Sequence, residues 1–254
     1  ALTTDHPRYK TLGTKVGDEY IQLNTAIIQI ENEYYSSIRP KRLVGSGERP
    51  INALRENGIE YVEIRALDNN IYDPFGISDE TAIFLESFLF YCLISEDQPC
   101  DADEISKIQN NWGNVVLSGR DDDLELHLKD GSVRLRDKAT EILDAMTNFE
   151  SRIGDPEYRN LFNRSLKSQR QKISDSNMTP SGKLLQEINT SGLTWDEYTN
   201  QIAISHKEEI LKSKRDVHYL EEQAKESLEE FAIKEAQKEK DFDSFIAEYL
   251  SAIE

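Results

Sequence analysis

Hydrophobic and polar residues alternate over two stretches within residues 1–75, and a period of two is typical of β-strands. The first stretch runs from Ile21 to Tyr35. Its predicted strand has one face that changes along its length from apolar to acidic, through Ile21, Leu23, Thr25, Ile27, Gln29, Glu31, Glu33 and Tyr35. The second stretch is Gly58–Leu67, where one face holds Ile59, Tyr61, Glu63, Arg65 and Leu67. The segment between them, Ile38–Asn57, is rich in Pro, Gly, Ser and Arg and predicts a loop.

From Ser78 onward the apolar residues recur at helical spacing, so the rest of the chain is expected to be mostly helical. Helices are predicted over about 78–95, 103–117 and 137–153, with a polar loop or short hairpin at 121–136. Further start signals are Asp155 before Pro156, Thr179 before Pro180, and the capping box formed by Thr194 and Glu197. A long amphipathic helix is expected to follow to about Lys240, and its apolar stripe holds Val217, Leu220, Ala224, Leu228 and Phe231.

These patterns predict an α+β fold with a strand-rich segment at 1–77 and a helical region at 78–254. A chain of 254 residues is long enough to bury a sizeable core. The apolar run Ile83–Ile94 is interrupted by Glu86 and is too short to cross a bilayer, so we expect a buried helix that includes Cys92. Two cysteines cannot form a disulfide framework, which favours a reducing, cytoplasmic setting. The chain begins without Met, and we expect it to be a piece of a longer protein.

The charge is distributed unevenly and indicates where an anion could bind. The net charge is −18, yet residues 1–70 hold ten acidic and nine basic residues and are almost balanced. The remainder therefore carries nearly all of the excess negative charge. A chain this acidic is a poor candidate for nucleic-acid binding, and any anion site is expected within the balanced first part.

Glu63 and Arg65 form the first candidate site. Residues two apart on a strand point the same way and lie about 7 Å apart. On a half-buried face such charges are costly unless each has a partner. A metal ion at Glu63 and a phosphate at Arg65 would satisfy both, while a structural ion pair between strands is the alternative, which the pattern alone favours.

Two further groups of charged residues lie close to this pair in the sequence. Glu31 and Glu33, with Tyr35, place two carboxylates on one strand face, where they need a cation between them unless that strand end is simply exposed. Pairing of the two predicted strands would bring these acids together with Arg65. The basic cluster Arg39, Lys41 and Arg42, stiffened by Pro40, suits a polyphosphate or a substrate carboxylate, or is a solvated turn. No Walker-A loop, dinucleotide-binding glycine motif or HExxH zinc motif is present.

At these segments the sequence resembles a known family. QIENEYYSSIRPKR (Gln29–Arg42) followed by GIEYVEIRALDNNIYDPFGI (Gly58–Ile77) resembles the bacterial glutamate–cysteine ligases of the proteobacterial type. The helical remainder, with NNWGNVVLSGR at Asn110–Arg120, is similar in layout. The resemblance covers essentially the whole chain and corresponds to the C-terminal half of that enzyme.

The resemblance implies a fold and a reaction. The fold is a distorted antiparallel sheet with packed helices, here as a half domain like that of glutamine synthetase. The reaction is the ATP-dependent ligation of the L-glutamate γ-carboxylate to L-cysteine through an acyl phosphate, the first step of glutathione synthesis. Its cofactors are ATP and Mg²⁺ or Mn²⁺.

The resemblance also implies roles for single residues. Arg65 corresponds to the catalytic cation at the transferring phosphoryl group, Glu63 to a metal ligand and Tyr35 to a substrate-binding hydroxyl at the cysteine carboxylate. Glu31, Glu33, Arg39 and Lys41 are motif members of less defined role.

The missing N-terminal half is an expected partner, because the family's other metal ligands lie there. We therefore expect this chain to be inactive alone and to expose apolar strand surface, which a second copy could cover. The competing hypothesis is a non-catalytic acidic helical module that binds other proteins through the predicted long helix. For that helix, packing of its narrow apolar stripe on its own domain is the expected outcome.

Overall fold

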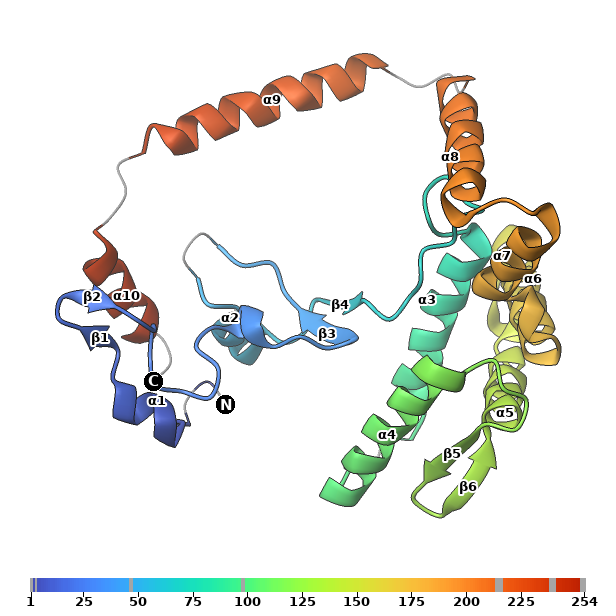
Figure 1. The fold of residues 1–254 in the computed structure, drawn as a ribbon, viewed down its shortest axis with the longest axis horizontal. Coiled ribbons are helices and arrows are strands. Elements are labelled where there is room, and N and C mark those ends of the chain that lie inside the picture. The colour runs from blue at the N-terminus through green and yellow to red at the C-terminus, as the bar shows by residue number, and fades with distance from the viewer. Residues whose placement is uncertain are drawn as a thin grey trace. The chain divides into compact units, whose positions relative to one another are not determined.

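The computed structural model describes residues 2, 4–45, 48–96, 99–212, 217–237 and 241–251. The chain divides into two compact units, one of residues 1–68 with 215–254 and one of residues 69–214 (Figure 1). Each unit is described by itself. The boundary thus lies at 68/69, and the C-terminal residues belong with the first unit rather than with the helical region that precedes them.

The first unit begins with helix α1 (Pro7–Leu12) and the short antiparallel hairpin of β1 (Lys15–Val16) and β2 (Glu19–Tyr20). Helix α10 (Phe242–Ser251) packs on this hairpin (Figure 1). The rings of Tyr20 and Phe242 meet edge to face at 5.3 Å, and Lys15 Nζ lies 3.1 Å from the Asp243 carboxylate. The β1–β2 hairpin and helix α10 are therefore joined within one unit.

The first unit also contains an antiparallel strand pair that the sequence did not predict. Strand β3 (Ile38–Lys41) pairs with β4 (Tyr61–Ile64), and helix α2 (Pro50–Asn57) lies between them in the chain. The second predicted strand is thus confirmed at its centre. The predicted loop is wrong at both ends, since it contains β3 and α2.

The strand predicted over Ile21–Tyr35 is wrong. That segment consists of bends, one isolated β-bridge from Ala26 to Asp5, and a 3-10 turn, η1 (Glu31–Glu33). The reason is that side chains satisfy the backbone locally: Gln29 Oε1 accepts from Leu23 N at 2.7 Å, and Asn24 Oδ1 accepts from Ala26 N at 2.8 Å. These bonds replace the ladder of a strand.

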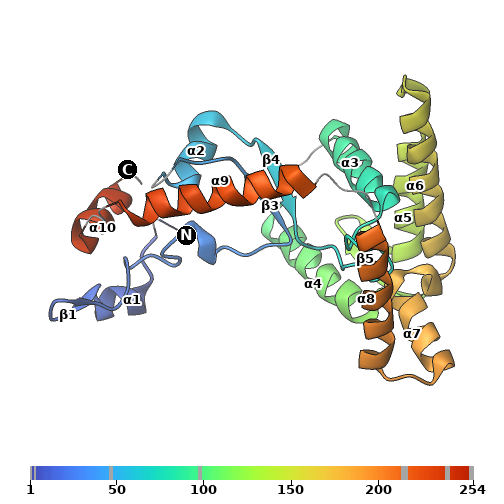
Figure 2. The same cartoon turned by 90° about the horizontal axis from the view of Figure 1, so that it is seen from above.

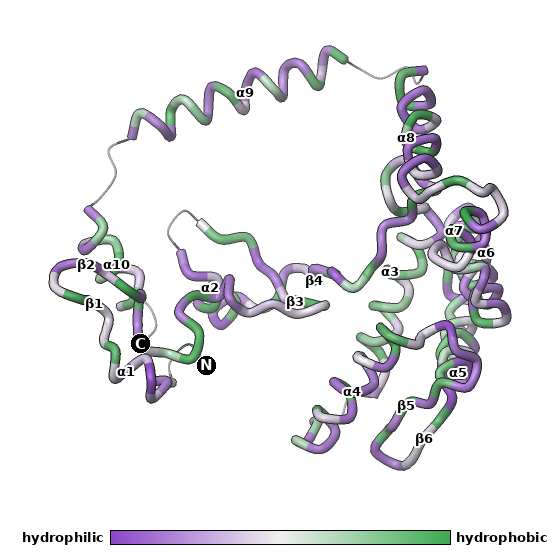
Figure 3. Tube along the Cα trace, in the orientation of Figure 1, coloured by the Kyte–Doolittle hydropathy of each residue, from purple (hydrophilic) through white to green (hydrophobic). Residues whose placement is uncertain are grey.

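The predicted long C-terminal helix is found as two described helices, α8 (Trp195–Lys212) and α9 (Val217–Glu235). Residues 213–216 and 240 lie outside the described residues. Every residue of α9 is exposed, including Leu228 at 70%, so the expectation that its apolar stripe packs on its own domain is wrong. Figure 3 shows green apolar positions along α9 between purple polar ones.

The second unit has its core between three helices, α3 (Asp79–Ile94), α5 (Leu135–Thr147) and α6 (Pro156–Ser174). Figure 2 shows α5 and α6 side by side. The buried centre is formed by Leu143 and Met146 from α5 and by Phe162 and Leu166 from α6. Phe84 and Phe88 of α3 pack against this cluster, but Cys92 is exposed, so its predicted burial is wrong.

The other elements of this unit are α4 (Ala102–Ser118), β5 (Glu125–Leu128), β6 (Gly131–Arg134), η2 (Glu150–Arg152), η3 (Ser176–Met178) and α7 (Pro180–Ser191). Strands β5 and β6 form the hairpin that was weighed against a loop. The Asn111 side chain of α4 bonds both backbone groups of His127, at 2.8 and 2.9 Å. This clamp holds the hairpin against α4.

The predicted helix starts are confirmed because each cap is a local interaction. Ser78 Oγ accepts from Thr81 N at 3.3 Å, and Asp155 accepts from Glu157 N at 2.8 Å. In the capping box Thr194 N donates to the Glu197 carboxylate at 2.9 Å. The α+β class is confirmed, with small antiparallel strand pairs among many helices. Among the described helices none is long and apolar enough to cross a membrane.

Candidate functional site

The β3–β4 register places a basic strand directly against the strand that carries Glu63 and Arg65. Arg39 lies opposite Glu63, and Lys41 lies opposite Tyr61. Because alternate residues of a strand share a face, Arg39 and Lys41 project on the same side as Glu63. The predicted partner of this strand was the acidic segment, so the observed pairing replaces acids with cations.

Glu63 is the centre of a charge cluster formed with Arg39, Lys41 and Arg65. Arg65 Nε donates to Glu63 Oε1 at 2.8 Å, and its NH2 group lies 2.7 Å from the same oxygen. Lys41 Nζ and Arg39 NH1 lie 3.5 and 3.9 Å from Glu63 Oε2. The hydrogen bond and the charge of Arg65, followed by the charge of Lys41, hold the pKa of Glu63 below its usual range despite the opposing effect of desolvation.

This cluster carries more positive than negative charge. Three cations surround one carboxylate, which leaves a formal excess of +2 in a chain whose net charge is −18. The ion pairs between strands that the sequence offered as the structural alternative are present, but they leave two cations without a compensating acid in the cluster. All four side chains are partly exposed, so an incoming anion can reach them.

Tyr35 joins the same cluster. Its ring lies below the Arg65 guanidinium, 5.1 Å from the ring centroid to Cζ, and the residue is 72% exposed. Arg65 N donates to Ser37 O at 2.7 Å, and this bond ties the Tyr35 segment to the end of β4. Tyr35, Glu63 and Arg65 therefore present a hydroxyl, a carboxylate and a guanidinium in one place.

Glu31 and Glu33 are not brought into this cluster. The Glu31 carboxylate forms a two-pronged ion pair with Arg49, both contacts at 2.9 Å, and accepts from the Tyr249 hydroxyl at 3.1 Å. Glu33 instead accepts from the Gln29 backbone at 3.0 Å. The expected meeting of the two acids with Arg65 is therefore wrong.

Arg49 is a buried charge that the sequence did not single out. It is 1% exposed, and its guanidinium also stacks over the Tyr249 ring at 4.5 Å. Burial by itself raises the pKa of Glu31, but the hydrogen bonds and charge of Arg49 outweigh it, so the pKa of Glu31 is lowered. The contacts among Glu31, Arg49 and Tyr249 connect η1, the start of α2 and α10, and their role is structural. No local signal marks Arg49, because its partners lie 18 residues or more away in sequence.

The described residues do not form a complete metal site. No group of three or more Asp, Glu, His or Cys side chains within them is placed to hold an ion. Glu63 Oε2 is nevertheless a buried oxygen without a hydrogen-bond donor, so it has a lone pair to offer. Glu63 fits the role of one carboxylate ligand whose companions come from outside this part of the chain.

Comparison with known proteins adds to this geometry. Residues 1–115 match the glutamate-cysteine ligase family. The chain is 36% identical over 257 residues to the glutamate–cysteine ligase of Alcanivorax borkumensis, covering 98% of the chain and 49% of that protein. It is 37% identical to the enzyme of Pseudomonas paraeruginosa, covering 100% of the chain and 48% of that protein.

A solved structure is similar over the same extent. The 2.0 Å crystal structure of the glutamate–cysteine ligase of Francisella tularensis in complex with AMP superimposes with a TM-score of 0.83 at 30% identity. The match covers 98% of this chain and 50% of that one. The chain thus spans about half the length of the relatives it matches.

Proposed function

We propose that this chain, which is similar from end to end to half of a glutamate–cysteine ligase, supplies the phosphate-facing side of such an enzyme. The complete enzyme joins the γ-carboxylate of L-glutamate to the amine of L-cysteine at the expense of ATP, the first step of glutathione synthesis. The observation that carries the proposal is the excess of cations around Glu63. The competing interaction module is not favoured, because the similarity extends over both units.

The proposed reaction has two steps. A glutamate γ-carboxylate oxygen attacks the γ-phosphorus of ATP, which forms an acyl phosphate and releases ADP. The cysteine amine then attacks the acyl carbon, phosphate leaves, and the amine loses a proton. Both steps move negative charge among phosphate oxygens, and fixed cations stabilise that charge.

Arg65 is proposed as the cation at the transferring phosphoryl group. A guanidinium presents a planar fork of N–H donors that matches phosphate oxygens, and the contact with Glu63 orients this fork. Arg39 and Lys41 would add charge beside it. The AMP bound in the Francisella tularensis structure supports a nucleotide as a ligand of the complete enzyme.

Glu63 is proposed as a ligand of Mg²⁺ or Mn²⁺, through the oxygen that lacks a hydrogen-bond donor. When bound, the ion would neutralise phosphate charge. The remaining ligands would come from the half of the enzyme that this chain does not match. Tyr35, exposed and beside Arg65, is proposed to donate a hydrogen bond from its hydroxyl to the cysteine carboxylate.

Two further inferences concern the chain as a whole. We infer that it works in the cytoplasm, where reduced cysteine is available. We also infer that it is inactive alone, because catalysis requires the glutamate site and the phosphate site in one assembly.

Reconstitution tests the proposal. The chain is mixed with the half of the Alcanivorax borkumensis ligase that it does not match, and ADP release is measured with glutamate, with and without cysteine. We expect cysteine-dependent turnover from the mixture and none from either part. Turnover by this chain alone would refute the inferred inactivity. If the mixture forms a complex but remains without activity, the proposed ligase function is contradicted.

A further inference from the structure

The second unit contains an apolar cavity that plays no part in the proposed ligation. Its volume is about 280 Å³, just below the range of about 300–1,000 Å³ for small-molecule sites. Its walls come from α3, α5 and α6, and its apolar lining includes Phe84, Phe88, Ile142, Leu143 and Ile173. Because Leu143 belongs to the core cluster, the cavity extends down to the core of the unit.

One cation on this wall is poorly satisfied. Lys172 is half-buried, and its ammonium makes one long hydrogen bond, at 3.4 Å, to Gln169 Oε1. Among the described residues no carboxylate lies within ion-pair distance of it. Burial lowers the pKa of Lys172, and the charge of Glu80 offsets only part of this effect while Glu80 itself pairs with Arg164. An ammonium has three donors, so at least two remain available to a ligand.

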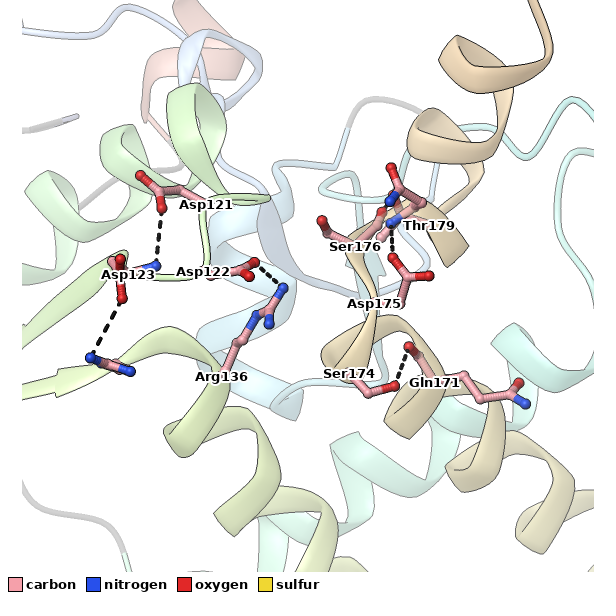
Figure 4. A network of polar contacts seen from close by, with 11 residues as sticks. Asp121, Asp122, Asp123, Arg136, Gln171, Ser174, Asp175, Ser176 and Thr179 are labelled. Carbon is pink, nitrogen blue, oxygen red and sulfur yellow. Dashed lines mark hydrogen bonds and ion pairs between the residues drawn. The ribbon is translucent and has the colours of Figure 1, made fainter. Parts of the chain in front are cut away.

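The mouth of the cavity is lined by polar side chains but by no carboxylate of the described residues. Arg136 is held by Asp122, and Ser176 and Thr179 lie in the turn across from it (Figure 4). Asp175 fixes this turn by accepting from Asn177 N at 2.9 Å. No carboxylate side chain lines the cavity within the described part of the chain. In so acidic a chain, this leaves a lining that favours anions.

Close backbone packing at Gly182 fixes the shape of the cavity mouth. A Cβ at this position would lie 2.5 Å from Ser176 O and 2.8 Å from Asn177 Cα, so only glycine allows α7 to pack on the turn. The shape of the mouth is thus set by backbone packing.

We propose that this cavity binds a small amphipathic carboxylate, with its hydrocarbon tail on the phenylalanine wall and its carboxylate on Lys172. The tail would remove water from Phe84, Phe88 and Ile173, and the carboxylate would pair a desolvated ammonium. Lys172 provides the selectivity for an anion, since Arg136, the other cation of the lining, is already paired with Asp122.

Calorimetric titration of the chain with octanoate tests this proposal, with octan-1-ol as the uncharged probe of equal length. We expect saturable octanoate binding and at least tenfold weaker binding of the alcohol. Lys172→Met keeps an unbranched side chain of nearly the same length, removes its charge and should weaken octanoate binding at least tenfold. Lys167→Met is the matched control, because Lys167 is an exposed residue of the same helix and does not line the cavity.

Absence of saturable octanoate binding, equal affinity for the alcohol, or unchanged affinity in Lys172→Met would each overturn the proposal. A second measurement does not depend on the variant. After reductive ¹³C-methylation, the NMR titration of Lys172 should show its pKa rising when octanoate is added, as a carboxylate partner stabilises the ammonium. An unchanged titration with octanoate bound would also overturn it.

Discussion

Glu63 shows how one side chain can be both paired and available. One of its oxygens holds Arg65, while the other lacks a hydrogen-bond donor among the described residues and lies near the charges of Lys41 and Arg39. The sequence predicted the first relation, because residues two apart on a strand share a face. It did not predict the second, since that required the basic segment to be the neighbouring strand. The result is a cluster with an excess of positive charge.

Arg65→Lys in the reconstituted ligase should keep the charge but lose the planar fork. We expect kcat for ADP release to fall roughly 10²–10³-fold, the effect of removing one donor to a developing oxyanion. Arg55→Lys is the control, because Arg55 is an exposed cation of α2 outside the cluster. Equal rates for the two variants would remove Arg65 from the chemistry.

Tyr35→Phe should change the kinetic parameters for cysteine and not those for glutamate. Loss of the hydroxyl should lower kcat/KM for cysteine by about 10–100-fold, the effect of losing a hydrogen bond to a charged group, and leave KM for glutamate unchanged. Tyr34→Phe is the matched control on the adjacent exposed tyrosine. An identical response from both variants would contradict the assignment of Tyr35.

The Glu31–Arg49 ion pair makes stability depend on pH. The pKa of Glu31 is lowered in the folded chain, so its contribution is present above its usual value of 4.5 and is lost as pH falls through the folded value. The difference in unfolding free energy between the wild type and Glu31→Gln should therefore shrink as pH drops below about 4.5. Urea unfolding from pH 7 to 3 measures it, and a constant difference would contradict this account.

At the scale of elements, the sequence predicted where helices begin but not which strands pair. Ser78, Asp155 and Thr194 begin their helices as predicted, because a cap joins residues two or three apart. Strand β3 escaped prediction because its four residues, with a central proline, resemble a loop until β4 lies beside them. A strand pair is decided by a neighbour distant in sequence, which one sequence alone does not reveal.

Helices of similar length should respond differently to the same change. Leu166→Ala in α6 removes a side chain that is 4% exposed and should lower the unfolding free energy by about 2–5 kcal/mol. Leu228→Ala in α9 should change it by no more than about 0.5 kcal/mol, since that residue is exposed. Denaturant titration compares them, and a large loss in Leu228→Ala would show that α9 packs on a partner.

At the scale of the whole molecule, the exposed apolar surface fits a chain that spans about half of its relatives. Ile38 and Val62, on the face of β3–β4 away from the charge cluster, are both exposed, as are Ile105, Ile108 and Trp112 on α4. Apolar strand surface left open is costly and invites a partner. We expect the unmatched half of the ligase to cover it in the complete enzyme.

Arginine side-chain NMR during an ATP titration tests the phosphate site most directly. The Nε–Hε signals of Arg39 and Arg65 should shift together and saturably. Those of Arg55, exposed on α2, and Arg49, buried with Glu31, should stay in place. Shifts of both Arg39 and Arg65 in the wild type, with the Arg39 shift lost or weakened in Arg65→Lys, would establish phosphate binding at β3–β4. Equal shifts at Arg55, or none at Arg65 with ATP bound, would contradict it.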